Sequence, residues 1–170
     1  MKKGVICTIL LWGAFIANGQ IAFEAQIGGS NFLGISLNTT FDIQLSESGN
    51  HYIVPSLGLG ILVPGWNEPT SIIHTGLNYR YKKWGLGAEV SGFMSNPFLG
   101  NEYNISSFVD MIIYPNANYT FQTKTNWYFK ISVGAYFAFS KQFYYESSKN
   151  PMYFAGDVIP GAGFSTGYKF

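Results

Sequence analysis

The sequence predicts an all-β protein: an eight-stranded antiparallel up-and-down transmembrane β-barrel preceded by a cleavable signal peptide. Eight segments alternate apolar and polar residues with a period of two, which is typical of strands with one apolar face. Charged residues make up only 11% of the 170-residue chain, against about a quarter in ordinary soluble domains, while aromatic residues reach 18%. Composition and alternation together therefore favour strands whose apolar face meets lipid.

The N-terminal segment has the pattern of a signal peptide. Lys2 and Lys3 give a positive start, an apolar run spans residues 5–16, and small residues follow up to Gly19. The run is shorter than the roughly 20 residues that a spanning helix requires, so a retained anchor is the less favoured alternative. We expect a signal peptide at residues 1–19 and a single outer-membrane barrel domain at residues 20–170.

Composition excludes two classes of function. The chain has 10 basic and 9 acidic residues, and losing Lys2 and Lys3 with the leader leaves a formal charge near −1. Nucleic-acid-binding domains usually carry a basic excess, so we expect no nucleic-acid partner. Cys7 would also be lost with the leader, which leaves no disulfide or thiolate chemistry in the mature domain.

Alternation defines the strands in chain order. We expect them at residues 21–29, 32–44, 52–63, 70–82, 84–94, 109–121, 126–140 and 157–170. The seventh is the clearest, because a period of two continues from Trp127 to Ser140, which indicates a strand and not a helix. The eighth alternates from Val158 to Phe170 and is expected to close the barrel, since a sheet in lipid leaves no edge unpaired.

The polar faces of the strands indicate which side of the wall they line. The second strand presents Gly34, Ser36, Asn38, Thr40 and Asp42, the third Ser56, Gly58 and Gly60, and the fifth Gly85, Gly87, Glu89 and Ser91. A water-facing surface would carry more lysine and glutamate, whereas a narrow barrel interior requires small side chains. We therefore expect the apolar face to point outward to lipid, and not inward as in a soluble lipocalin-like barrel.

Strand ends and connections predict the orientation. Aromatic residues gather at the strand ends that share a side with the C-terminus, as in an interfacial girdle: Phe41, Tyr79, Tyr81, Trp84, Tyr119, Phe121, Trp127, Phe129, Tyr168 and Phe170. The links on that side are short, at 45–51, 83 and 122–125, which is typical of periplasmic turns. The other links are long, except that residues 30–31 are expected to form a tight hairpin. Pro115 and Pro160 should mark a bulge or a sheet end, because proline removes a ladder hydrogen bond.

With its leader, eight amphipathic strands and closing segment Phe164-Ser165-Thr166-Gly167-Tyr168-Lys169-Phe170, the chain resembles the small eight-stranded outer-membrane β-barrel proteins of Gram-negative bacteria, of the OmpA-barrel and OmpX type. The resemblance covers the mature chain. It implies export to the outer membrane, contact with outer-membrane lipid, and recognition of a C-terminal aromatic signal, here Tyr168 and Phe170, by the barrel assembly machinery. Ser165 departs from the glycine that the family often has at this position.

Alternation places eight ionisable residues on the inward face: Glu24, Asp42, His74, Arg80, Glu89, Asp110, Lys130 and Lys169. Charges in a low-dielectric space must be paired, so we expect ion pairs, with Glu24 near Lys169 across the seam and Arg80 reaching Glu89. An ion-selective lumen is one interpretation. A polar plug is favoured, because eight strands enclose only enough room for side chains.

Signals for catalysis, cofactors or metals are weak. His74 lies close in sequence to Ser71 and Thr75, but alternation turns it away from lipid, where a lipid-modifying enzyme would need it. The Gly-Xaa-Gly segments precede no helix that could hold a dinucleotide, and the histidines and carboxylates lack metal-ligand spacing. We expect a non-enzymatic protein with no cofactor and no metal.

The last outer link carries the candidate contact residues Tyr144, Tyr145, Tyr153 and Phe154. Exposed aromatic residues interleaved with charge are typical of contact surfaces, although these residues could also extend the outer girdle. We therefore expect a small barrel that contributes to envelope integrity or binds an unknown surface ligand through its loops. The alternatives are a lipid-modifying barrel enzyme and a narrow pore.

Overall fold

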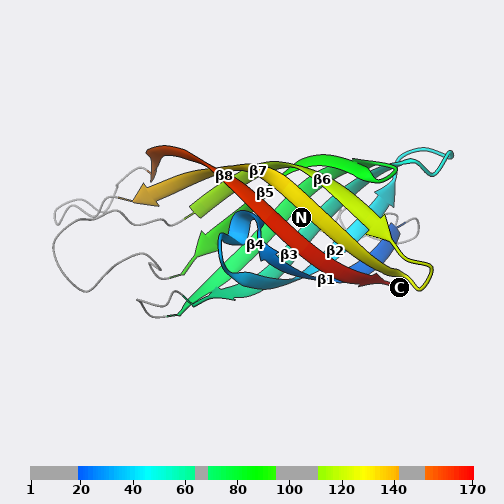
Figure 1. The fold of residues 1–170 in the computed structure, drawn as a ribbon, viewed down its shortest axis with the longest axis horizontal. Helices are drawn as coiled ribbons and strands as arrows, with labels where there is room; N and C mark the ends of the chain where they lie inside the picture. Colours follow the sequence, from blue (N-terminus) through cyan, green and yellow to red (C-terminus); the bar gives the residue numbers. More distant parts are fainter. Residues whose placement is uncertain (1–18, 64–68, 95–110, 142–151) are drawn as a thin grey trace, which may run out of the picture.

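The computed structural model describes residues 19–63, 69–94, 111–141 and 152–170. The elements in chain order are β1 (Gly19–Gly28), a 3-10 turn η1 (Gly29–Asn31), β2 (Ile35–Gln44), β3 (His51–Leu62), β4 (Thr70–Tyr81), β5 (Trp84–Phe93), β6 (Met111–Gln122), β7 (Trp127–Lys141) and β8 (Met152–Lys169). Each strand pairs antiparallel with the next, and β8 pairs with β1 (Figure 1). The predicted all-β fold, a closed eight-stranded up-and-down barrel, is confirmed.

The observed strand limits differ most from the expected ones at β2 and β8. β2 begins at Ile35 and not at residue 32, and β8 begins at Met152 and not at residue 157. Tyr153 and Phe154, expected in a loop, are therefore strand residues paired with β7. Tyr144, Tyr145 and the leader up to residue 18 lie outside the described residues.

The barrel wall is apolar outside and polar inside. On β7, Phe129, Ile131 and Val133 are 40%, 48% and 59% exposed, whereas Ser132 between them is 3% exposed. A similar alternation runs along the other strands where burial is described, although on β3 it begins only at Leu57. Successive side chains of a strand point to opposite faces of the sheet. The predicted orientation of the two faces is therefore confirmed. Among the described residues, no helix has the length and hydropathy needed to cross a bilayer.

The C-terminus and the turns after β2, β4 and β6 lie at the same end of the elongated barrel (Figure 1). Aromatic rings make edge contacts on the outer surface there, with centroid separations of 4.8 Å for Trp84–Tyr119, 5.5 Å for Trp127–Tyr168 and 5.5 Å for Phe23–Phe170. We call this end the basal end and the opposite one the loop end.

The two prolines interrupt pairing in different ways. The β6–β7 ladder skips Tyr114 and Pro115 and resumes in the same register at Asn116, whose side-chain amide donates to the Tyr114 carbonyl at 3.2 Å. Pro115 therefore causes a gap and no bulge. On β8, Pro160 remains opposite Ala135, and the register shift lies further toward the loop end, between Phe137 and Phe139 of β7.

The expectation of a tight hairpin at residues 30–31 was wrong. Gly28 and Gly29 have φ values of +72° and +59°, and the chain turns into the barrel at η1. A Cβ on Gly28 would lie 2.5 Å from the Ala162 carbonyl oxygen, so glycine permits both the backbone conformation and the close approach. Ser30 and Asn31 are fully buried, and η1 contacts β4, β5, β6, β7 and β8.

Candidate functional site

Six of the charged residues expected inside the barrel line its lumen, where they form two clusters of ion pairs. The seventh, Asp110, lies outside the described residues. The central cluster contains Glu24, Glu89 and Lys130, and the basal cluster contains Asp42, Arg80 and Lys169. Together they comprise three carboxylates and three basic groups. Their formal charges cancel, as is required of ions that have little access to water.

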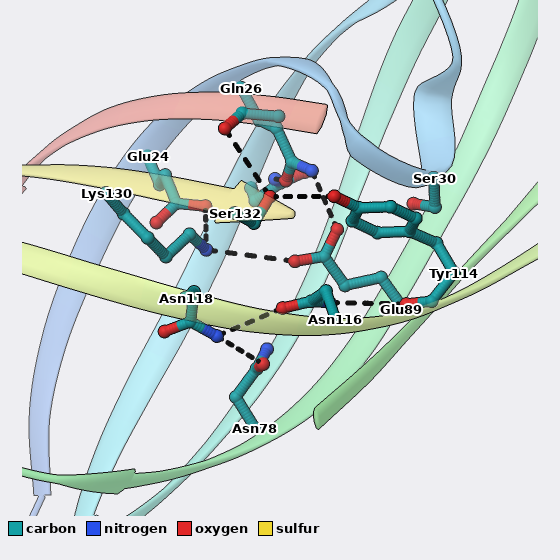
Figure 2. A network of polar contacts seen from close by, with 12 residues as sticks. Glu24, Gln26, Ser30, Asn78, Glu89, Tyr114, Asn116, Asn118, Lys130 and Ser132 are labelled. Carbon is teal, nitrogen blue, oxygen red and sulfur yellow. Dashed lines mark hydrogen bonds and ion pairs between the residues drawn. The ribbon is translucent and has the colours of Figure 1, made fainter. Parts of the chain in front are cut away.

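Lys130 is the centre of the central cluster (Figure 2). Its Nζ lies 2.9 Å from Glu24 Oε1 and 3.9 Å from Glu89 Oε1. Tyr128 donates its hydroxyl to Glu24 Oε2 at 2.9 Å, and Gln26 donates its amide to Glu89 Oε2 at 2.8 Å. The two glutamates are 3% and 1% exposed, so water does not solvate their carboxylates. Lys130 and these hydrogen-bond donors offset the cost of burying the two negative charges.

Three asparagine side chains form a second set of hydrogen bonds beside the central cluster (Figure 2). Asn118 donates to Asn78 Oδ1 and to Asn116 Oδ1, both at 3.0 Å. All three residues lie on the inward faces of β4 and β6 and are less than 10% exposed. The side chains therefore fill this level of the barrel and bond to one another.

Asp42 holds the basal cluster together. Arg80 binds it with two hydrogen bonds, Nη2 to Oδ2 at 2.7 Å and Nη1 to Oδ1 at 3.0 Å, and Lys169 Nζ lies 2.6 Å from the same Oδ2. The Arg80 guanidinium also lies over the Tyr52 ring, 4.5 Å from its centroid. One carboxylate thus pairs with two cations, which leaves the basal cluster with a formal charge of +1 that balances the −1 of the central cluster.

The pairings expected from the sequence were wrong, although the residues were the right ones. Lys169 lies opposite Ala22 in the β1–β8 ladder, nearer the basal end than Glu24, and its ammonium reaches Asp42. Arg80 lies opposite Gly85, well below Glu89 along β5. Strand tilt brings together residues of different heights along their strands, and alternation alone does not determine those heights.

Little space remains between the two clusters. A cavity of about 30 Å³ is lined by residues of both, including Glu24, Asp42, Arg80 and Lys130. A cavity needs roughly 10–15 Å³ to hold one water molecule, so this one has room for about two. At this level, the lumen is a packed polar interior.

The η1 turn closes the lumen above the central cluster. Ser30 Oγ lies 2.9 Å from both His74 Nδ1 and Ser91 Oγ, and Ser91 donates to Asn31 Oδ1 at 2.9 Å. Asn31 in turn donates to Ser36 Oγ at 2.7 Å. His74 therefore contacts Ser30 and, at 3.3 Å, Ser91, and not Ser71 or Thr75.

The Ser30–His74 contact has the composition of a nucleophile and its base, but both residues are inaccessible. Their exposed fractions are 0% and 1%. A catalytic pair must reach its substrate, so the described geometry gives this contact a structural role in holding η1.

Beyond η1, the lumen changes from polar to apolar. The cluster nearest the loop end consists of Leu62, Ile72, Phe93, Ile112, Tyr114 and Tyr136, with Phe32 packed against it. Tyr114 belongs to this cluster, yet its hydroxyl lies 3.3 Å from both Ser132 Oγ and the Gly161 carbonyl oxygen, and Figure 2 shows the ring beside Ser132. Apolar packing thus covers the polar lumen at this end.

Sequence reasoning missed Ser30, Asn31 and the inward tyrosines Tyr114 and Tyr128. A signal for the turn was present, because three glycines surround it at positions 28, 29 and 34. The tyrosines stood on the polar faces of their strands, where Tyr128 covers Gly167 on the neighbouring strand. An aromatic ring over a glycine fills the space that a missing side chain leaves.

The predicted assembly signal lies at the closing seam. Tyr168 is paired with Phe23 on β1 and Trp127 on β7, and the Phe170 amide donates to the Ile21 carbonyl at 2.9 Å. The Phe170 side chain is 68% exposed on the outer surface. Both residues are therefore placed where the last strand joins the first.

The fold and lumen together define a class: a small closed β-barrel with an apolar exterior and a charge-balanced polar interior. Comparison with known proteins found no matching family model, no matching curated sequence and no matching solved structure. Within the described ranges, no group of three or more histidine, cysteine, aspartate or glutamate side chains is placed to hold a metal ion.

Proposed function

We propose that this chain is a small, non-enzymatic outer-membrane β-barrel protein of a Gram-negative bacterium, exported with a cleaved signal peptide, which contributes to envelope integrity or surface interaction through its loops. The observation that carries the proposal is the inverted distribution of side chains. Leu37, Leu59 and Leu86, on three different strands, are 67–71% exposed, while charged residues lie inside. An apolar surface that surrounds a barrel requires a solvent as apolar as lipid.

The ends of the barrel support an orientation in that membrane. Trp and Tyr side chains favour the boundary between hydrocarbon and headgroups, and an outward belt of them lies at the basal end. Short turns at this end favour the periplasmic side. Phe170 and Tyr168, outward and at the seam, are suitably placed for recognition by the barrel assembly machinery.

The interior supports a structural role. Ion pairs and amide contacts fill the lumen, the intervening cavity is only about 30 Å³, and η1 occupies the space above. A lipid-modifying activity has weaker support, because the Ser30–His74 contact is buried from lipid.

Replacement of Val133 by arginine tests the membrane location. Val133 points outward in the middle of β7. Val133→Arg should therefore lower the free energy of unfolding in phospholipid vesicles by about 2–4 kcal/mol, which is the cost of a cation at the bilayer midplane. The matched control Thr125→Arg, in the exposed β6–β7 turn, should change it by less than about 0.5 kcal/mol. Urea titration of protein refolded in vesicles measures both.

The folded wild type should also float with the vesicles and migrate differently on gels before and after boiling. Three results together would contradict the membrane location and favour the soluble lipocalin-like barrel. The two arginine variants would be equally stable, the wild type would migrate identically on gels before and after boiling, and it would not float with the vesicles.

A narrow pore is the second candidate, because the ion pairs lie in succession along the lumen. We expect no stable unitary conductance from the purified protein in planar bilayers, since the described lumen is packed. A porin reconstituted in parallel shows that the membrane can report channels. Reproducible conductance steps would replace the structural role with that of a channel.

A further inference from the structure

Within the part of the chain that the structure describes, the barrel wall has a gap on one side at the loop end. Pairing between β1 and β8 runs from Ala22 and Lys169 to Gly28 and Gly163, and it ends where η1 turns inward. β8 continues to Met152, but among the described residues it is paired beyond Gly163 with β7 alone. The inward turn that fills the lumen therefore leaves a gap in the wall beside β8.

An apolar groove occupies this gap. Its volume is about 650 Å³, within the range of roughly 300–1000 Å³ typical of small-molecule sites. Ile27, Leu33, Ile131, Ile159 and Phe164 line it, together with Phe32 and the buried Tyr136. None of the described lining residues is charged, and the exposed ones continue the apolar outer surface of the barrel.

The backbone beside the groove is adapted to an apolar neighbour. Pro160 has no N–H to leave unpaired, and the Ala162 carbonyl, which points to the β1 side, accepts a hydrogen bond from the Tyr136 hydroxyl at 3.4 Å. An open sheet edge in hydrocarbon is tolerated only where its polar groups find partners in the protein. The Tyr136 hydroxyl supplies such a partner from the lumen side.

These observations favour a lipid chain over a second copy of the protein as the occupant. Addition of another strand at this edge requires free N–H and carbonyl groups, and proline on an edge strand opposes it. A hydrocarbon chain requires no hydrogen bonds and fits an uncharged lining that opens into the apolar surface.

We propose that this groove, which we call the seam groove, binds one acyl chain of a lipid in the leaflet that surrounds the loop end. The proposal rests on the outer-membrane location proposed above, in which that leaflet is the outer one. Recognition is by the chain and not by the headgroup, because the described lining offers no charged group. The bound chain restores the lateral contact that β8 loses when β1 turns inward.

Photo-cross-linking in vesicles tests the seam groove. The full mature chain is refolded in phosphatidylcholine vesicles that contain a trace of phosphatidylcholine with a diazirine near the end of one acyl chain. After irradiation, mass spectrometry should find cross-links concentrated at Ile27, Phe32, Leu33 and residues 159–164, above the level at equally exposed residues of other strands. Ala162→Trp, at an exposed position in the groove, should reduce these cross-links by about tenfold, equivalent to about 1.4 kcal/mol. Ala117→Trp, at an exposed position on β6, is the matched control and should leave them unchanged.

Three results would overturn the inference. Cross-links spread evenly over the wall would show that no site is favoured, while leaving the membrane location intact. Unchanged groove cross-links in Ala162→Trp would place the chain elsewhere. Disulfide-linked dimers of Ala162→Cys, formed in high yield where Ala117→Cys forms none, would assign the groove to a second copy. A protein that neither floats with vesicles nor cross-links anywhere would overturn the membrane location itself.

Discussion

Replacement of Lys130 by methionine is expected to destabilise the barrel by about 3–5 kcal/mol, the cost of breaking a buried ion pair from one side. Lys130 Nζ is the cation shared by Glu24 and Glu89, at 2.9 and 3.9 Å. Methionine keeps much of the side-chain volume and removes the charge, so two carboxylates remain in the lumen without a counter-ion. Urea unfolding of the refolded protein, followed by tryptophan fluorescence, measures the loss.

Two further variants separate charge from packing. Lys124→Met removes the same charge from an exposed turn and should change stability by less than about 0.5 kcal/mol. Adding Glu24→Gln and Glu89→Gln to Lys130→Met should recover part of the loss, because the amides carry no charge to compensate. A triple variant no more stable than Lys130→Met alone would mean that packing, and not charge balance, accounts for the effect.

Replacement of Asp42 by alanine should cost a similar amount, about 3–5 kcal/mol, for the opposite reason. Arg80 and Lys169 both bind Asp42, at 2.7 and 2.6 Å, and its loss leaves two cations close together in a space with little water. The same urea titration applies, and Glu47→Ala in the exposed β2–β3 turn is the control.

Removing one of the two cations should relieve part of this penalty. The double variant Asp42→Ala with Lys169→Met is expected to be more stable than Asp42→Ala, since Arg80 can still lie over the Tyr52 ring. If the changes in the free energy of unfolding caused by the two single substitutions simply add in the double variant, the charges of the basal cluster are not coupled.

The sequence predicted the wall of this barrel well because a strand offers only two faces. On β7, the choice between them follows from the contrast of Phe129 and Val133 with Lys130 and Ser132, and that contrast repeats around the sheet. Which charged residues enter the lumen follows from the same alternation. The partner of each charged residue does not follow from alternation, because it depends on strand register and tilt. These bring Lys130 to Glu24, on strands far apart in the chain.

The turn at η1 could not be predicted for a different reason. Gly28 and Gly29 favour a tight reversal of the chain, but the same glycines permit either an exposed hairpin or an inward turn. The inward turn is stabilised by the contacts of Ser30 with His74 and Ser91. These residues are separated from Ser30 by 44 and 61 positions in the chain. The seam groove could not be predicted either, because it forms only where the chain after β1 turns away from the wall.

The inward turn also constrains the order of assembly. Its contacts come from β4 to β8, so they cannot form until most of the chain has been arranged around it. Contacts between residues far apart in the chain cost conformational entropy, because the long segments between them must be closed into loops. Such contacts therefore form late in folding. The amino-terminal hairpin, although synthesised first, is thus expected to settle last, together with the joining of β1 to β8.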